Sequence, residues 1–187
     1  MRPEHVEIMK ARARNIALRL SYDGTRYHGF QRQSLPVVAV QNVLEKVLAE
    51  VCGEPVELAA AGRTDTGVHA YGQVVNFFTD GRIPVAQLPR AVNGLLPPDI
   101  AVMAAWEAGR DFSARHSSTG KAYLYRIERC TVPNPFTRNY AWQIFRPLDV
   151  EAMRAALAML VGTHDYSSFR AAGGAPMSPV RTIDEIR

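Results

Sequence analysis

The sequence predicts an α+β fold with a mixed, mostly antiparallel sheet, and three observations support this prediction. Several short segments alternate apolar with polar residues, which is the pattern of half-buried strands. Three other segments carry apolar residues at helical spacing. The strand-like and helix-like segments follow one another irregularly, roughly β-α-β-loop-β-α-β-β-α-loop-β, and this order disfavours a regularly wound parallel sheet.

The first strand is expected over residues 15–22, because apolar side chains alternate along it and would share one face: Ile16, Leu18, Leu20 and Tyr22. A polar loop with two glycines, DGTRYHGFQRQ, follows this strand. Residues 38–52 predict a helix, since valines and leucines recur there at helical spacing. Gly53 stands where a C-cap is expected.

Two strands are expected on either side of the segment AGRTDTGVHA, one at residues 56–60 and one at 73–79. A helix is expected to begin at Pro84, and Pro89 should shorten or kink it. Further strands are expected at residues 99–108 and 121–129.

The last predicted helix covers residues 149–162 and is capped by Gly162. A loop over 167–179 and the beginning of a strand at 180–187 follow it.

We expect three parts along the chain. Residues 1–14 form a basic N-terminal extension, and residues 15–108 form an N-terminal half that carries the loop AGRTDTGVHA. Residues 109–187 form a C-terminal half that is expected to be incomplete at its C-terminus.

Charge is unevenly distributed along the chain, whose formal net charge is +4. Residues 8–32 hold six basic side chains and one acid, and residues 110–146 hold seven and two, whereas residues 33–109 have a net charge of −4. Of the 22 basic residues 19 are arginine, which binds phosphate with its planar fork and stacks on bases. This distribution favours a polyanion-binding surface. A general arginine bias in the composition explains it about as well.

Several classes of protein are disfavoured. The chain has no run of 18 apolar residues and its basic N-terminus is not followed by an apolar segment, so neither a membrane span nor a secretory signal is predicted. Cys52 and Cys130 lack CxxC spacing and are expected to be buried free thiols in a reducing cytoplasm. The histidines lack HExxH spacing, which argues against a zinc site.

The segment AGRTDTGVHA, residues 61–70, carries more charged and polar side chains than a turn requires. Arg63 stands near Asp65, and an arginine favours the ionised form of a carboxylate, as a carboxylate nucleophile requires. Capping of the loop by Asp65 is the simpler alternative. Phosphate-loop, dinucleotide and serine-hydrolase motifs are absent, and Ser21 replaces the nucleophile of an aspartyl-phosphate loop, so a phosphate-handling hydrolase is disfavoured.

Six segments, in this order, strongly resemble the TruA family of tRNA pseudouridine synthases: YDGTRYHGFQRQ, VQNVLEKVL, AGRTDTGVHAYGQVVNF, LPPDIAV, FSARHSSTGKAYLYRI and GTHDYSSFR. The resemblance extends from Ile16 to Ile183. It implies the pseudouridine-synthase fold, with a sheet built from two RRM-like halves and helices on one face. It also implies a cytoplasmic homodimer that isomerises uridines 38–40 in the anticodon stem-loop of tRNA, without a cofactor or metal.

The resemblance also assigns site residues. Asp65 matches the catalytic aspartate of the family, Arg63 its arginine partner, and Tyr123 the tyrosine that stacks on the target base. Tyr125, on the same expected strand face, is expected to pack in the core. Three basic residues in the two basic segments are expected to bind substrate: Arg26, Arg115 and Lys121.

The sequence departs from the family in three places. Phe30 replaces the usual tryptophan, and Ala39 replaces a hydroxyl-bearing residue, which should weaken the helix start by about 1 kcal/mol. Family members continue beyond RTI to a segment whose arginine approaches the catalytic aspartate. We therefore expect these 187 residues to form an incomplete synthase with an exposed sheet edge and little activity. The alternative function is a non-catalytic RNA-binding or RNA-chaperone module with a vestigial active site.

Overall fold

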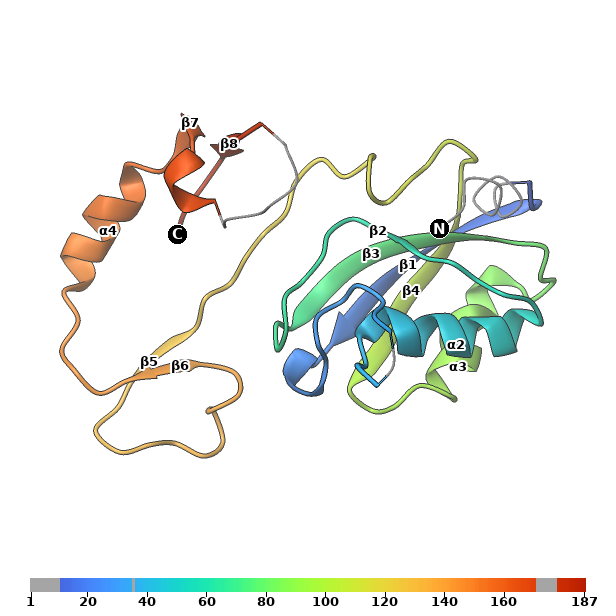
Figure 1. Ribbon diagram of the computed structural model, residues 1–187, viewed down its shortest axis with the longest axis horizontal. Helices are drawn as coiled ribbons and strands as arrows, with labels where there is room; N and C mark the ends of the chain where they lie inside the picture. The colour runs from blue at the N-terminus through green and yellow to red at the C-terminus, as the bar shows by residue number, and fades with distance from the viewer. Residues whose placement is uncertain (1–10, 35, 171–177) are drawn as a thin grey trace. The chain divides into compact units, whose positions relative to one another are not determined.

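The computed structural model describes residues 11–34, 36–170 and 178–187 (Figure 1). Most of the predicted N-terminal extension and residues 171–177 of the predicted loop lie outside this part. The chain forms two compact units, of which the first ends at Tyr123 and the second begins at Leu124.

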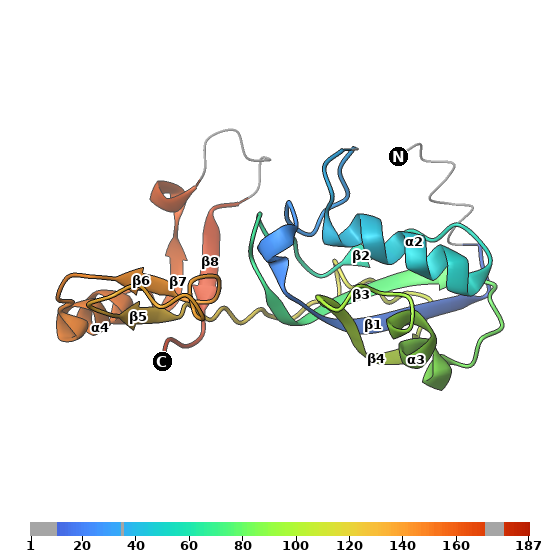
Figure 2. The same cartoon turned by 90° about the horizontal axis from the view of Figure 1, so that it is seen from below.

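The first unit contains a four-stranded antiparallel sheet with the strand order β2-β3-β1-β4 (Figure 2). Its strands are β1 (Arg14–Tyr22), β2 (Ala59–Ala60), β3 (Ala70–Thr79) and β4 (Ile100–Ala108). The central strand β1 pairs with both β3 and β4 along nearly its whole length. The predicted α+β class with an antiparallel sheet is therefore confirmed for this unit.

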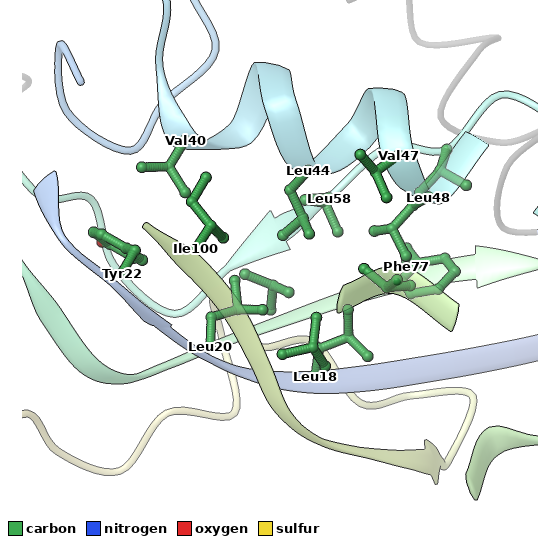
Figure 3. Packing of buried hydrophobic residues seen from close by; sticks show 14 of the residues in the cluster. Leu18, Leu20, Tyr22, Val40, Leu44, Val47, Leu48, Leu58, Phe77 and Ile100 are labelled. Atoms are coloured by element: carbon green, nitrogen blue, oxygen red, sulfur yellow. The ribbon is translucent and has the colours of Figure 1, made fainter. Parts of the chain in front are cut away.

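Two helices, α2 (Val40–Cys52) and α3 (Leu88–Asn93), bury their apolar residues in the same core as one face of the sheet. Figure 3 shows apolar side chains of α2 and of the strands facing one another across this core: Val40, Leu44, Val47 and Leu48 from the helix, Leu18, Leu20 and Phe77 from the sheet. As predicted, α2 ends at Gly53, which adopts the left-handed conformation with φ 72°.

The first two amides of α2 are capped by carbonyls of a preceding loop, and the Asn42 side chain accepts from the amide of Ala39 (3.2 Å). Ala39 occupies the N-cap and makes no side-chain cap bond. Instead, the amide of Val40 donates to the carbonyl of Gly29 (3.2 Å) and the amide of Gln41 to the carbonyl of Phe30 (2.9 Å). Both amides belong to the unpaired donors at the start of a helix, and that of Gln41, at N2, is one that a serine or threonine N-cap would otherwise serve. The missing hydroxyl at Ala39 therefore leaves the helix start with hydrogen-bond partners.

Pro89 shapes the second helical segment. A 3-10 turn, η2 (Val85–Gln87), begins directly after Pro84 and runs into α3, so helical structure starts where expected but its first turn is 3-10. Pro89 lies in the first turn of α3, where its missing N–H needs no partner within the helix. The proline thus shortens the α-helix, as predicted, by fixing where it begins.

The opposite face of the sheet is partly covered by the segment 109–117. Two amide side chains on this face, Asn15 and Asn76, are each only 2% exposed. The Asn15 amide group donates to the carbonyl of Phe112 (2.9 Å), and the Asn76 amide oxygen accepts from the amide of Ala114 (2.8 Å). These buried bonds tie the segment to the sheet.

The described part of the second unit contains β5 (Ile127–Arg129), β6 (Trp142–Ile144), α4 (Val150–Ala158), β7 (Gly162–Asp165), a 3-10 turn η3 (Ser167–Phe169) and β8 (Val180–Ile183). β5 and β6 pair in parallel, and β7 and β8 pair antiparallel. The side chain of Asp149 caps α4 by accepting from the amide of Ala152 (2.9 Å).

Several predictions for this region are wrong. The strand expected at 121–129 is reduced to β5, because β6 is its partner only from Ile127 onward and a strand needs a paired neighbour. Tyr125 is 87% exposed, not packed in the core. The last helix ends before Gly162, which begins β7 with φ 108°. Neither β6 nor β7 was predicted.

Cys52 and Cys130 are free, as expected, but only half-buried.

Candidate active site in the first unit

Three connecting segments meet at one edge of the four-stranded sheet. Tyr22, the last residue of β1, pairs with Ala70 at the start of β3 and with Ile100 at the start of β4. Antiparallel pairing therefore brings the loop 23–31 next to the loop 61–69 and to the residues that precede β4. The predicted catalytic loop lies at this edge.

The loop 61–69 turns sharply immediately after Asp65. The carbonyl of Asp65 accepts from the amide of Val68 (3.1 Å), and Gly67 adopts φ 78° within this turn. Both Asp65 and Arg63 are exposed. Within the described part of the chain these two side chains form no ion pair with each other, so the carboxylate is open to a ligand from solution.

The loop 23–31 holds the backbone on both sides of Asp65. Before it, the carbonyl of Thr64 accepts from the amide of Phe30 (3.0 Å). After it, the amide of Gly67 donates to the carbonyl of Tyr27 (3.2 Å). Asp65 therefore projects from a backbone that is fixed at both flanks, and we call the loop 23–31 the seat of the catalytic loop.

Two glycines allow this close contact between the backbones. A Cβ at Gly29, whose φ is 80°, would lie 2.6 Å from the carbonyl oxygen of Thr64. A Cβ at Gly24 would lie 2.0 Å from the carbonyl oxygen of Val68. Both distances are shorter than any ordinary carbon–oxygen contact, so a side chain at either position would push the two loops apart.

Side chains add further bonds that hold the catalytic loop to the seat and to Tyr22, the residue before it. The Tyr22 hydroxyl lies 2.8 Å from Thr64 Oγ1. Burial raises the pKa of the Tyr22 hydroxyl, and its hydrogen bond to Thr64 only partly offsets this, so the phenol stays protonated. His69 Nδ1 lies 3.0 Å from both the Gly24 amide and Asp23 Oδ1. That nitrogen accepts from the amide or donates to the carboxylate, depending on its tautomer, and either bond connects the two loops.

The seat is itself anchored to the residues that precede β4. The Tyr27 hydroxyl donates to Asp99 Oδ1 (2.6 Å), and the amide of Asp23 donates to the carbonyl of Asp99 (2.9 Å). Burial, followed by the bond to Asp99, raises the pKa of the Tyr27 hydroxyl far above its usual range. Arg26 lies 3.6 Å from Asp99 with an exposed side chain.

The structure brings some of the predicted substrate-binding residues to the catalytic loop. Arg26 belongs to the seat, and a Cβ at Gly62 would lie 2.8 Å from Lys121 Nζ, so Lys121 contacts the start of the catalytic loop. Arg115 instead follows the buried Ala114 on the segment 109–117 and is exposed. Tyr123, 74% exposed, lies at the end of the first unit.

Half of the basic residues that the sequence places in segment 8–32 serve the fold. Three arginines form ion pairs with glutamates of the same unit: Arg12 with Glu54 (3.4 Å), Arg14 with Glu107 (2.5 Å) and Arg32 with Glu45 (3.1 Å). The net charge of the segment therefore overstates the number of cations open to phosphate. Arg19, Arg26 and Arg32 are the arginines of this segment with exposed side chains in the described residues, and Arg32 is one of those paired with a glutamate.

Sequence reasoning missed the seat and the role of Tyr22, the residue that precedes it. Tyr22 was assigned to the core, and Gly24 and Gly29 were treated only as loop residues. The spacing of the two glycines within DGTRYHG was a usable signal, since a glycine often marks a close backbone approach.

Residues 11–34, 36–170 and 178–187 contain no group of three or more histidine, cysteine, aspartate or glutamate residues placed to hold a metal ion. None of the helices in the same ranges is long and apolar enough to cross a membrane.

The fold and the site define an α+β protein in which a glycine-rich loop presents a carboxylate at the edge of an antiparallel sheet. The tRNA pseudouridine synthase family matches residues 20–117. The tRNA pseudouridine synthase A of a Thermoanaerobacter species is 46% identical over 173 residues, which cover 92% of this chain and 70% of that relative. Those of Myxococcus xanthus and Neisseria gonorrhoeae are also 46% identical, over 91% and 92% of this chain and 64% and 65% of theirs.

This chain belongs to the tRNA pseudouridine synthase family. The matched residues include the whole seat and the whole catalytic loop. The resemblance that the six sequence segments indicated is thereby confirmed.

We predict that the substitution Gly29→Ala destabilises the protein more than Gly53→Ala does. Both glycines have positive φ, so each variant loses about 1–2 kcal/mol through left-handed backbone strain. A Cβ at Gly53 meets no atom within 4 Å, whereas one at Gly29 collides with Thr64. The collision should add about 1–3 kcal/mol. Urea unfolding measures the loss in free energy of unfolding for each variant. Equal losses would show that a side chain at residue 29 does not collide with the catalytic loop.

Proposed function

We propose that this protein converts uridine to pseudouridine in tRNA, with uridines 38–40 of the anticodon stem-loop as its targets. The observation that carries this proposal is the placement of Asp65: an exposed carboxylate on a loop whose backbone is bonded on both flanks, in a chain that belongs to this family. Its relatives are named tRNA pseudouridine synthase A.

The reaction matches the groups available. The N1–C1′ bond of uridine breaks, the uracil turns in place, and a C5–C1′ bond forms; the proton on C5 leaves and N1 gains one. Reactant and product are isomers, so no electron donor or acceptor takes part. The Asp65 carboxylate has two possible roles: it attacks C1′ as a nucleophile, or it removes a sugar proton to give a glycal. Both roles require the ionised carboxylate.

The target uridine has to leave its stack before Asp65 can reach C1′. Arg63, exposed two residues before Asp65, is our candidate for the residue that takes the place of the flipped base. Tyr123 is our candidate for the stacking partner, because its exposed ring provides a flat surface for the uracil.

Three cations are proposed to bind the tRNA backbone: Arg26, Arg115 and Lys121. All three are exposed, in contrast to Arg12 and Arg14, whose side chains are largely covered. We further propose that the protein acts as a cytoplasmic homodimer and that residues 15–108 and 109–187 correspond to two RRM-like halves with helices on one face.

The central prediction concerns Asp65→Asn in the full-length protein. This substitution keeps the size of the side chain and removes its charge, so pseudouridine formation should fall at least about 1000-fold while tRNA binding changes little. A mass assay for pseudouridine after incubation with tRNA measures turnover. Near-normal turnover would refute the assignment of Asp65. Binding without turnover by the wild-type protein would instead favour the non-catalytic RNA-binding alternative.

A second prediction separates the ring of Tyr123 from its hydroxyl. Tyr123→Phe keeps the stacking surface, so it should retain base stacking and lose only what the hydroxyl contributes to proton removal at C5. Tyr123→Ala should also lose about 1–3 kcal/mol of stacking. Single-turnover rates and tRNA affinities of both variants test this. If both variants match the wild type, Tyr123 does not contact the target base.

A third prediction concerns salt. Affinity for tRNA should fall steeply with ionic strength because phosphate contacts release counterions. Replacing Arg26 and Arg115 by alanine should reduce the slope of log K against log salt by about 1 for each arginine, without changing the modified position. Arg154→Ala is the matched control, because Arg154 is similarly exposed but lies on α4, outside the residues proposed to bind the tRNA backbone. An unchanged slope for the double variant would contradict the proposed footprint.

A further inference from the structure

We infer that Tyr22 is a positioning residue for the reaction: its hydroxyl fixes Thr64 and thereby the backbone from which Asp65 projects. This inference rests on the proposed function, because it assumes that Asp65 acts on the substrate. Tyr22 itself is 4% exposed and lies behind the catalytic loop.

Thr64 is held from two directions. Its Oγ1 lies 2.8 Å from the Tyr22 hydroxyl, and its carbonyl oxygen accepts from the amide of Phe30 (3.0 Å). The rings of Tyr22 and Phe30 are neighbours, with centroids 6.1 Å apart and planes inclined by 36°. The two groups that hold Thr64 therefore belong to one packed unit, at the residue immediately before Asp65.

The hydroxyl of Tyr22 forms a hydrogen bond to the catalytic loop that the ring alone could not form. A phenylalanine at this position would fill the same space in the core, in contact with the same apolar residues. The hydroxyl adds one bond, and that bond goes to a side chain of the catalytic loop. Because burial keeps the phenol protonated, this bond does not vary with pH over the neutral range.

Asp65 has no comparable support of its own. Its exposed side chain has no ion pair and no side-chain hydrogen bond within the described part of the chain. The position of its carboxylate is therefore set by the backbone of the loop. Reaction rates depend steeply on such placement, and a misplacement of about 1 Å lowers a rate about 100-fold. A small displacement of Thr64 should therefore affect the chemical step more than tRNA binding.

The test uses Tyr22→Phe and Thr64→Val, which remove the two hydroxyls with little change in volume. Each should lower the single-turnover rate about 10-fold. The Kd for tRNA should stay within about twofold, because neither hydroxyl reaches the surface that we assign to phosphate binding. The double variant should be no slower than either single variant, since one bond is lost in all three. Thr64→Ser keeps the Oγ and should restore most of the rate.

The matched control is Tyr166→Phe. Tyr166 donates its hydroxyl to the carbonyl of Leu160 (2.7 Å) in the second unit, far along the chain from the catalytic loop. This variant loses a bond of the same kind and should keep the wild-type rate. If Tyr22→Phe fails to fold, Thr64→Val and Thr64→Ser carry the test, because Thr64 lies at the less buried end of the bond.

The outcomes separate the two proposals. A Tyr22→Phe rate within about twofold of wild type, with an inactive Asp65→Asn variant, would overturn the positioning role and leave the proposed function intact. Additive losses in Tyr22→Phe and Thr64→Val would also overturn it, because the hydroxyls would then act independently. Turnover by Asp65→Asn would overturn the proposed function instead.

Discussion

The contact between the backbones of the loops 23–31 and 61–69 is the constraint on which the site depends. Hydrogen bonds from Phe30 to Thr64 and from Gly67 to Tyr27 hold the catalytic loop on both sides of Asp65. They form only because Gly29 has no side chain between the two chains. The side chain of Asp65 is thus exposed to solvent, while main-chain hydrogen bonds on both sides hold the backbone that carries it.

Ion pairs divide the arginines of the first unit into two groups. Arg32 illustrates the structural group: it pairs with Glu45, whose carboxylate is buried on α2 and also accepts from the amide of Leu58 (3.0 Å). Desolvation raises the pKa of Glu45, and that arginine and these hydrogen bonds act against the rise. Arg19, which is exposed and forms no ion pair within the described residues, represents the other group. A sequence sum of charges cannot separate the groups, because the partners of an arginine lie far away in the chain.

The sequence predicts those parts of the molecule that local periodicity determines. Alternation along β1 and helical spacing along α2 both correspond to one buried face, and each element was predicted within two residues of its ends. The motif around Asp65 was also recognisable, because its chemistry is local. The segment 121–126 was wrongly predicted as strand, since strand formation depends on a partner that alternation does not reveal. The seat was missed for a related reason: its role lies in contacts with residues some forty positions away.

Gly29 and Phe30 form hydrogen bonds to two structures at once. Their carbonyls accept from the amides of Val40 and Gln41 at the start of α2, while the Phe30 amide donates to the carbonyl of Thr64. Local unfolding generally proceeds in cooperative units that share hydrogen bonds. Fraying of the first turn of α2 would therefore release the loop that bears Asp65, and a ligand that immobilises this loop would protect the helix end from hydrogen exchange. Substrate occupancy would then be reported by the amides of Val40 and Gln41, which bond to the seat and not to the loop that bears Asp65.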